Sequence, residues 1–226
     1  MKLLRILTIP AAALLAVTAA AATLPAQASH SWGSYHWSRS GQVTAPLISS
    51  VTSDWSGNLT VAKNDWNSSP YIQSGVVAGS TSSSTRSSCP MATGQIRVCN
   101  YTYGNNGWAG LASINLSGGH ISRGSVKLND TYESGAPAAE RQGVMCQEVG
   151  HTYGLAHQDE NFNNPNLGTC MDYTNNWGTN QHPNSHDFNQ LASIYSHSDK
   201  AAAASGTKGV TTIKTGSTVT MITWAK

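Results

Sequence analysis

The stretch QEVGHTYGLAH, which begins at Gln147, constrains the fold more than any other part of the sequence. Residues four apart in a helix lie on the same face, so Gln147 and His151 project in one direction, while Glu148 lies about 100° around the axis. Gly154 follows three residues after His151 and can adopt the left-handed backbone conformation that ends a helix. The chain then turns, and His157 returns toward the side that carries His151. The stretch therefore predicts a helix that ends in a sharp turn.

This spacing lets Gln147, His151 and His157 converge on one ion and leaves a fourth position open. Three protein ligands and an open position are typical of catalytic rather than structural zinc. Glu148 would lie close enough to take a proton from water at the open position. A lone E-x-x-H is common by chance, whereas E-x-x-H-x-x-G-x-x-H fixes four positions over ten residues. The pattern thus predicts Zn²⁺ as cofactor, with Glu148 as a catalytic residue beside it.

The same residues resemble the metzincin metallopeptidases, whose pattern is H-E-x-x-H-x-x-G-x-x-H followed by a methionine turn. Met171 stands 14 residues after His157, in the sequence TCMDY, and is similar to the methionine of that turn. The resemblance implies that Met171 lies beneath the metal ligands. It also implies that Tyr173 is catalytic and binds the metal or steadies the transition-state oxyanion, as in astacin-like and serralysin-like members.

The resemblance extends to matrixins outside the metal-binding pattern. Residues 110–115 and 124–129 are similar to the matrixin edge strand and its neighbour, and residues 185–195 are similar to the last matrixin helix. The implied fold is α/β (α+β), a metzincin-like catalytic domain with a twisted mixed sheet, an edge strand, an active-site helix, a Met-turn and a C-terminal helix. A substrate would lie antiparallel to the edge strand near residues 107–114. Residues 175–184 would shape the primed-side pocket.

The sequence departs from the metzincin pattern at the first ligand, because Gln147 stands where the family has histidine. A glutamine amide oxygen can bind zinc, but it is uncharged and harder than imidazole, so the affinity should fall. Gln147 is then the ligand of a weaker site; or a histidine from another segment, such as His182 or His186, replaces it; or the site is empty and the domain is inactive. The first interpretation is favoured, because the other parts of the pattern are all in register.

The chain has four cysteines, and an even number in an exported protein suggests two disulfides. Three pairings can form, and sequence alone does not choose among them. We favour Cys89–Cys99, which closes a short loop, together with Cys146–Cys170. The second bond would join the predicted ligand helix to the Met-turn. A four-cysteine zinc site would need paired C-x-x-C spacings, which the sequence lacks.

Short apolar stretches between turn-forming residues indicate strands in the first half of the chain and again at its end. The strands are expected at residues 76–78, 96–98, 111–116, 125–128 and 217–224. Helices are indicated by a proline in the first turn, by a glycine stop and by apolar residues at helical spacing. They are expected within residues 45–66, from Pro137 through His151, and from Ser185 onward.

The first 28 residues have the pattern of a secretory signal peptide. Lys2 and Arg5 supply the positive start, an Ala/Leu run supplies the apolar middle, and A-Q-A supplies the cleavage site. The expected organisation is a signal peptide at residues 1–28, a catalytic domain at residues 29–199, and a linker with a C-terminal β-like tail at residues 200–226. The mature protein is expected to be secreted and extracellular.

The charge of the chain argues against nucleic-acid and membrane partners. The chain has 13 Lys and Arg residues against 11 Asp and Glu residues, and loss of the signal removes two basic residues and no acid. The mature formal charge is then zero, and no Lys/Arg cluster follows. Both partners need a concentrated positive face. The expected partner is an extended peptide or protein substrate, and the chain is expected to be a monomer.

Three features outside the pattern receive a plain structural interpretation. His36 and His120 are isolated in polar surroundings and are predicted to be surface or packing residues. Residues 159–168 are dense in oxygen donors and could hold Ca²⁺, although a polar loop is the favoured interpretation.

The sequence therefore predicts a secreted zinc-dependent metalloendopeptidase that hydrolyses peptide bonds with metal-activated water and Glu148 as general base. The main alternative is a catalytically inactive metzincin-like domain that binds peptides or cell-wall or matrix material. Another is a secreted hydrolase of a different kind, whose histidines bind another metal. Bound zinc and the effect of Glu148→Ala distinguish the first from the inactive domain.

Overall fold

The computed structural model describes residues 29–197, 199 and 212–225 of the chain. The expected signal peptide, and residues 200–211 of the expected linker, lie outside the described residues. Within the described residues, no helix combines the length and the apolarity needed to cross a membrane.

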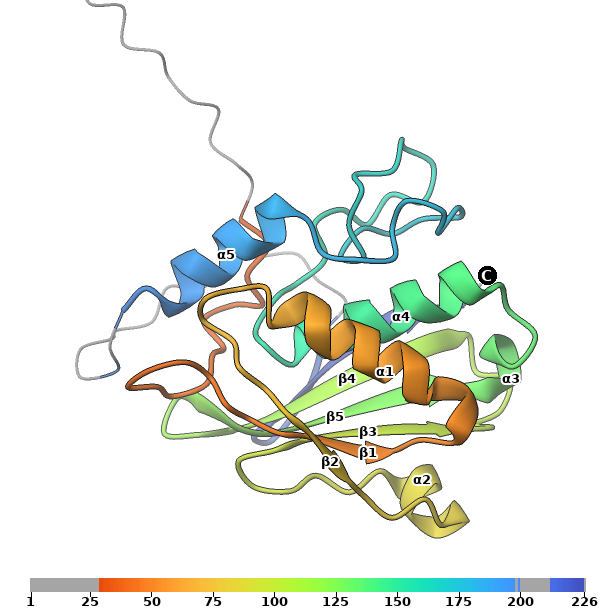
Figure 1. Cartoon of the computed structure of the whole chain (residues 1–226), viewed down its shortest axis with the longest axis horizontal. Helices are drawn as coiled ribbons and strands as arrows, with labels where there is room; N and C mark the ends of the chain where they lie inside the picture. Colours follow the sequence, from red (N-terminus) through yellow and green to blue (C-terminus); the bar gives the residue numbers. More distant parts are fainter. Residues whose placement is uncertain (1–28, 198, 200–211, 226) are drawn as a thin grey trace, which may run out of the picture.

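A seven-stranded mixed sheet supports the molecule, with the strand order β2-β1-β3-β5-β4-β7-β6 (Figure 1). The strands are β1 (Leu47–Ser50), β2 (Val76–Ala78), β3 (Ile96–Tyr101), β4 (Trp108–Ser117), β5 (His120–Asn129), β6 (Thr212–Thr215) and β7 (Thr218–Trp224). Strands β2, β1, β3 and β5 are parallel, whereas β4 is antiparallel to both β5 and β7. The mixed α/β architecture that the sequence predicts is confirmed.

Two long helices cover one face of the sheet, and α2 lies on the other side (Figure 1). The helices are α1 (Ser53–Trp66), α2 (Ser83–Ser88), α3 (Asp130–Glu133), α4 (Ala138–His151) and α5 (Ser185–Tyr195). Helix α1 buries Trp55, Leu59, Ala62 and Trp66, which share one face because they are spaced by three or four residues. The indole nitrogen of Trp66 donates a hydrogen bond to the carbonyl of Cys146, 3.0 Å away, and ties α1 to α4.

Helix α4 is the most enclosed element, since every residue from Gln142 to His151 is buried. It lies between α1, the sheet and the chain around Met171. A helix that is buried on all sides must hold its polar residues for a reason other than solubility. The polar side chains in its second half are those that the sequence singles out as metal-site residues.

Both favoured disulfides are confirmed. Cys89 pairs with Cys99 and joins α2 to β3, and Cys146 pairs with Cys170 and joins α4 to the residue before Met171. The two Cα–Cα distances are 5.9 Å, inside the usual range for a disulfide.

The open edge that the sequence predicts along β4 is covered in the structure. Strand β7 pairs with β4 in antiparallel register, from Trp108 opposite Trp224 to Asn115 opposite Thr218. The expectation of a closing strand is correct, but its partner could not be read from local pattern. The pairing places the C-terminal segment where the substrate was expected.

Candidate metal centre

The end of α4 brings His151 and His157 together as the glycine spacing predicts. Gly154 has a φ of +89°, and a Cβ at this position would overlap the backbone carbonyl oxygen of Tyr35. Only glycine can adopt this positive φ without strain and also lacks the Cβ for which there is no room. The turn returns the chain so that the Nε2 atoms of His151 and His157 lie 3.1 Å apart.

The other nitrogen of each ring fixes the tautomer. The Nδ1 atom of His151 lies 2.8 Å from the carbonyl oxygen of Leu155, and that of His157 lies 3.1 Å from a carboxylate oxygen of Glu160. Both partners are acceptors, so each Nδ1–H must be the donor. The Nε2 lone pairs then face each other, as in metal-binding histidines held by a carbonyl or a carboxylate.

Two facing lone pairs repel unless a cation lies between them, so this geometry tests whether the pair suits zinc. Nitrogens at 2.0–2.1 Å from a tetrahedral ion are separated by about 3.3–3.4 Å. The observed separation of the Nε2 atoms of His151 and His157 is 3.1 Å, close to that value. Burial lowers the pKa of both rings, and for His151 the neighbouring His157 adds to this effect. Both imidazoles are therefore neutral at pH 7, the form that binds metal.

Gln147 lies on α4 one turn before His151 and is fully buried. Its side-chain oxygen accepts a hydrogen bond of 2.6 Å from the Thr223 hydroxyl on β7, and its side-chain nitrogen has no partner. The structure thus gives Gln147 the face that a third ligand needs, but its amide oxygen is engaged by β7.

The two histidines considered as substitutes for Gln147 lie elsewhere. His182 is bonded to Asp65 through a 2.8 Å contact, and His186 stacks on His30 with ring centroids 4.8 Å apart. Among the residues that the structure describes, no histidine, cysteine or carboxylate forms a group of three ligand atoms within 4.8 Å with His151 and His157. Gln147 is therefore the third donor to consider.

Glu148 places a buried carboxylate on α4, three residues before His151. The side chain is fully buried, and neither oxygen makes a hydrogen bond of ordinary geometry. A Cβ on Gly110 of β4 would lie 2.5 Å from one of these oxygens, so glycine makes room for the carboxylate. Burial raises the pKa of Glu148 to about 8, although the nearby Thr223 hydroxyl and Ala112 amide oppose the rise. A buried, unpaired carboxylate is costly and marks a candidate functional residue.

Met171 and Tyr173, which the resemblance assigns to the Met-turn, lie close to α4 and to His157, respectively. Met171 is fully buried and packs against α4 at Gly150, where a Cβ would lie 2.8 Å from the methionine sulfur. The ring of Tyr173 lies against His157, with centroids 4.2 Å apart. Its hydroxyl donates a 3.0 Å hydrogen bond to the carbonyl oxygen of Ile222 on β7, and burial raises its pKa. The hydroxyl therefore reaches a peptide carbonyl beside the histidine pair.

The loop after His157 gives no support to a calcium site. A side-chain oxygen of Asp159 accepts the backbone amide of Asn161, and a side-chain oxygen of Asn161 accepts that of Asn163. These bonds form turns and use the oxygens that would bind an ion. In the described part of the chain, no group of three candidate ligand side chains includes a residue of this loop.

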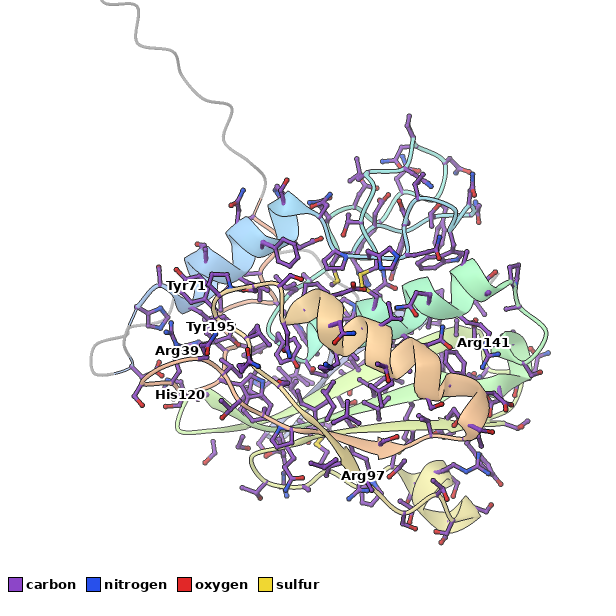
Figure 2. The ribbon with its side chains drawn as sticks, in the orientation of Figure 1. Arg39, Tyr71, Arg97, His120, Arg141 and Tyr195 are labelled. Carbon is purple, nitrogen blue, oxygen red and sulfur yellow. A yellow bond between two sulfur atoms is a disulfide. The ribbon has the colours of Figure 1, made fainter. Side chains whose placement is uncertain are left out.

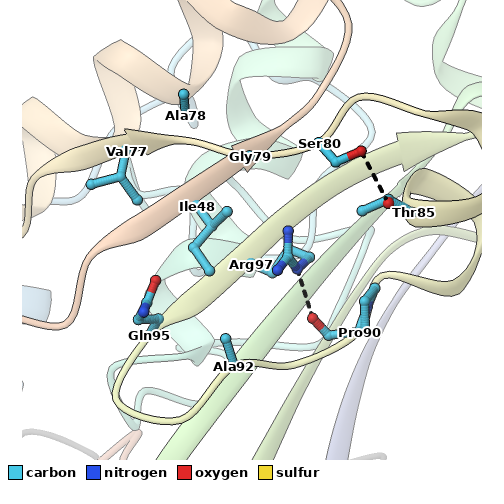
Figure 3. Close-up of a pocket in the computed structure, with 10 residues that line it drawn as sticks. All are labelled: Ile48, Val77, Ala78, Gly79, Ser80, Thr85, Pro90, Ala92, Gln95 and Arg97. Carbon is cyan, nitrogen blue, oxygen red and sulfur yellow. Dashed lines mark hydrogen bonds between the residues drawn. The ribbon is translucent and has the colours of Figure 1, made fainter.

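A hollow of about 440 Å³ lies far from the histidines, beside β1, β2 and α2 (Figure 3). Its charged residue, Arg97, donates hydrogen bonds to the Pro90 carbonyl at 2.6 Å and to the Ser50 hydroxyl at 2.9 Å. The guanidinium of Arg97 thus already forms hydrogen bonds within the protein and is not free for a ligand. The hollow lacks the buried titratable groups that the histidine pair has beside it.

Sequence reasoning missed three contributors to the centre. Glu160 and the Leu155 carbonyl orient the two rings, and Thr223 bonds Gln147. Glu160 follows His157 by three residues, a spacing that could have suggested the contact. Thr223 is 76 residues from Gln147, so no local pattern could reveal it.

No family model matches the sequence, and no match is found among curated proteins. Among solved structures, 23 chains match. One is high choriolytic enzyme 1 (HCE-1), a hatching enzyme zinc-protease from Oryzias latipes (medaka fish), with a TM-score of 0.39 and 14% identity over 71% of this chain and 94% of that chain. Another is myroilysin, with a TM-score of 0.41 and 12% identity over 72% of this chain and 86% of that chain. With such low scores, the likeness by itself carries no conclusion about what this chain does.

Proposed function

We propose that the protein is a secreted zinc-dependent metalloendopeptidase of the metzincin type. The observation that carries the proposal is the 3.1 Å approach of two neutral imidazole Nε2 atoms, together with the buried carboxylate of Glu148 on the same helix as His151. This combination of a metal-binding pair and a free base is what metal-assisted hydrolysis of a peptide bond requires.

Three residues would hold the ion. His151 and His157 already have the orientation and protonation that binding requires, and Gln147 would supply its amide oxygen from the preceding turn of α4. That oxygen must exchange its hydrogen bond with Thr223 for the metal. The neutral oxygen makes a weaker ligand than imidazole, so we expect a lower zinc affinity than a three-histidine site would have.

Zinc, when bound, acidifies a water molecule and polarises the scissile carbonyl. Glu148 takes the proton from the attacking water and passes it to the leaving amine. Burial raises the pKa of Glu148, but a nearby divalent cation favours the ionised form that a base needs. Tyr173 donates its hydroxyl hydrogen to the developing oxyanion, as it now donates to the Ile222 carbonyl.

The proposed substrate is an extended peptide or protein segment that pairs with β4. Two disulfides fit an oxidising, extracellular location. The signal peptide at residues 1–28 and the monomeric state belong to the same proposal. We also propose that residues 175–184 shape the primed-side pocket.

A second candidate is an inactive metzincin-like domain that binds peptides or cell-wall or matrix material. The hydrogen bond between Thr223 and the Gln147 side-chain oxygen favours it, because this bond occupies the third donor. The two candidates differ in whether the histidine pair holds a metal and whether Glu148 matters to any activity.

The test measures metal content and peptide cleavage in the chain from residue 29 to residue 226. We expect zinc at the histidine pair, cleavage of a casein or peptide substrate that a chelator abolishes, and a fall of at least about 10²-fold in Glu148→Gln with zinc retained. His182→Ala, a change in an exposed histidine bonded to Asp65, serves as the matched control. Zinc binding that is unaffected by His157→Ala, or activity unaffected by Glu148→Gln, would reject the peptidase assignment.

A further inference from the structure

Four side chains that can bind metal meet where the N-terminal segment, the start of β5 and the end of α5 come together, next to the turn that follows α4. His36 comes from the N-terminal segment, His120 begins β5, and His197 and Asp199 follow α5. Figure 2 shows His120 at this junction, near Arg39 and Tyr195. The sequence predicts His36 and His120 to be isolated surface or packing residues; both are partly exposed, but they are not isolated, because both contact Asp199.

The ligand atoms of His36, His120 and Asp199 all lie within 4.8 Å of one another, as in a metal site, and His197 approaches two of these three residues. One carboxylate oxygen of Asp199 lies 3.1 Å from Nε2 of His36, 3.1 Å from Nε2 of His120 and 3.5 Å from Nε2 of His197. The Nε2 atoms of His36 and His197 are 3.3 Å apart. Ligand atoms around a tetrahedral zinc ion are separated by about 3.3–3.4 Å. All four separations lie close to this value.

The hydrogen bonds behind the rings direct the lone pairs toward the same point. The Nδ1 atom of His36 lies 2.8 Å from the Ser34 carbonyl oxygen, and that of His120 lies 3.2 Å from the Gly118 carbonyl oxygen. Each Nδ1–H is therefore a donor, and the Nε2 atom of each ring faces the Asp199 carboxylate. A metal cation between the two nitrogens and the carboxylate would satisfy all of these atoms, and a proton on each Nε2 is the alternative.

We propose that His36, His120, His197 and Asp199 bind a second divalent cation, zinc by the nature and spacing of the donors. Three imidazoles and one carboxylate supply four protein ligands, which leaves no open position and defines a structural rather than a catalytic site. The backbone carbonyls behind His36 and His120 are the outer partners that such ligands use. All four side chains are partly exposed, which gives the ion a path from solution.

The ion would add a cross-link between three segments that already meet at this junction. The amide of Ile121 donates a 2.7 Å hydrogen bond to the carbonyl of His36, and Trp37 forms an isolated bridge with Ile121. The amide of Trp37 also donates a 3.2 Å hydrogen bond to the hydroxyl of Tyr195 at the end of α5. The cation would cross-link the N-terminal segment, the β4–β5 turn and the end of α5 at this junction.

The competing explanation is a set of protonated histidines around Asp199. It would place positively charged rings next to one another, with centroids 4.8 Å apart for His36 and His120 and 5.0 Å apart for His36 and His197. One carboxylate cannot neutralise two or three such charges, whereas one divalent ion satisfies all four donors. The two explanations differ in whether metal is bound.

The experiment counts zinc per chain by elemental analysis after dialysis against buffer without chelator. His120→Ala and Asp199→Asn should each lower the count by about one relative to the unchanged chain, and the control His182→Ala should not change it. If the predicted catalytic site is empty, the unchanged chain holds about one zinc and His120→Ala holds none. The zinc counts therefore distinguish failure of the second site from failure of the proposed catalytic site. An equal count in His120→Ala, Asp199→Asn and the unchanged chain would overturn the proposal.

Cobalt substitution gives a second measurement that leaves all four proposed ligands of the second site unchanged. Co²⁺ added to the metal-free, unchanged chain should produce the intense visible bands of a tetrahedral nitrogen–oxygen site. These bands should persist in His157→Ala, which changes only the predicted catalytic pair. Weak octahedral bands alone in His157→Ala would rule out a closed site at Asp199.

A separate observation concerns β7 and rests on the proposed peptidase function. We infer that β7 occupies the peptide-binding edge as an internal, substrate-like strand that inhibits the enzyme. It runs antiparallel to β4 over the residues where a substrate is expected, with Thr223 opposite Gly110 and Ile222 opposite Leu111. Main-chain pairing at an exposed sheet edge is a common way to bind an extended peptide.

The contacts of β7 match those expected of a substrate at the centre. Tyr173 donates to the Ile222 carbonyl, Thr223 bonds the Gln147 oxygen, and the amide of Ala225 donates a 2.7 Å hydrogen bond to the Gly107 carbonyl. The side chain of Met221 is fully buried, so the strand is firmly seated. An external peptide can pair with β4 only after β7 leaves.

The test releases β7 from the full chain and measures peptide binding without relying on catalysis. Met221→Asp places a charge at a fully buried position, whereas the control Ile213→Asp changes a residue on β6 that is 55% exposed. In the Glu148→Gln background, a fluorescent peptide copy of residues 217–225 should bind Met221→Asp at least tenfold more tightly than Ile213→Asp, by anisotropy. With Glu148 present, Met221→Asp should cleave peptides at least tenfold faster than the unchanged chain.

A cut made after folding provides the second variant. A specific protease site inserted in the exposed turn between β6 and β7, at residues 216–217, allows the folded chain to be cleaved and β7 to be displaced by excess peptide. Equal peptide binding before and after the release of β7 would contradict the proposal that β7 occupies the peptide-binding edge of β4. Peptide binding that appears on release without any zinc-dependent cleavage would instead reject the peptidase function and leave the occupied edge in place.

Discussion

At the scale of single residues, Gln147 would decide how strongly the proposed centre holds an ion. Replacing it by histidine exchanges a neutral oxygen donor for an imidazole, which zinc prefers. We expect Gln147→His to raise zinc affinity at least tenfold, measured by competition with a chromophoric chelator in a His120→Ala background that removes the second proposed site. Gln142→His, on another face of α4, is the matched control and should leave the affinity unchanged. An unchanged or lower affinity in Gln147→His would show that this side chain does not face the metal.

Glu148 makes the stability of the metal-free protein depend on pH. Burial raises its pKa to about 8 from an ordinary value of 4.5, so between these pH values the folded state holds a proton that the unfolded state has lost. The unfolding free energy therefore falls as pH rises through this window. Glu148→Gln removes this loss, and its stability advantage should grow by up to about 5 kcal/mol from pH 4.5 to pH 8.

This difference is measured by urea unfolding of both proteins after chelation, at several pH values. Burial also lowers the pKa of His151 and His157, which costs stability as pH falls below about 6.5, but both proteins share this effect and it cancels in the difference. Zinc should reduce the slope, because a cation lowers the pKa of the carboxyl. A difference that stays constant with pH would show that Glu148 is ionised in the metal-free fold.

At the scale of elements, local pattern found the helices and strands that have clear boundaries. α4 begins next to Pro137 and ends before Gly154, and α5 has a capping box at Asn184, so both helices were predicted close to their observed bounds. Strand β1 was assigned to a helical stretch because it has only four residues. Helix α2 was missed because SSTRSS has low helix propensity, and its Ser82 cap and the Cys89–Cys99 bond hold it.

The Cys146–Cys170 bond should support the metal centre as well as the fold. It joins the residue before Gln147 to the residue before Met171 across 24 positions of sequence. For a loop of this length, the chain-entropy relation gives a loss of about 3.5 kcal/mol when both cysteines become alanine. We also expect weaker zinc binding, because the ligand helix is no longer fixed to the turn beneath it.

Cys89→Ala with Cys99→Ala provides the matched control for that prediction. This bond spans 10 positions and joins α2 to β3, away from the centre. Its loss should cost about 2.7 kcal/mol by the same relation and leave zinc affinity unchanged. Urea unfolding and zinc titration of both double variants separate the two effects. Equal losses of zinc affinity would show that the Cys146–Cys170 bond has no special role at the centre.

At the scale of the whole molecule, the sequence could not reveal contacts between distant segments. His151 and His157 were predicted to meet because a helix and one glycine turn fix their geometry over six residues. His36 and Asp199 are 163 residues apart and meet only because the N-terminal segment reaches the end of α5. The pairing of β7 with β4 is also a contact between segments that are distant in the sequence. Long-range sheet pairing and segment docking depend on the completed core, not on local periodicity.

Removal of both metal ions should therefore lower the stability of the whole fold, and the two sites should contribute separately. An ion present at about 1,000 times its dissociation constant stabilises the folded state by about 4.1 kcal/mol. For a chain of this size, 1 kcal/mol shifts the thermal midpoint by about 2–4 °C, so each saturated site should raise it by about 8–16 °C. Calorimetry with and without a chelator should show the full shift in the unchanged chain and only part of it in His120→Ala or His157→Ala. A full shift in His120→Ala would mean that the histidines around Asp199 hold no ion that matters to folding, and that the junction of the three segments is stable without one.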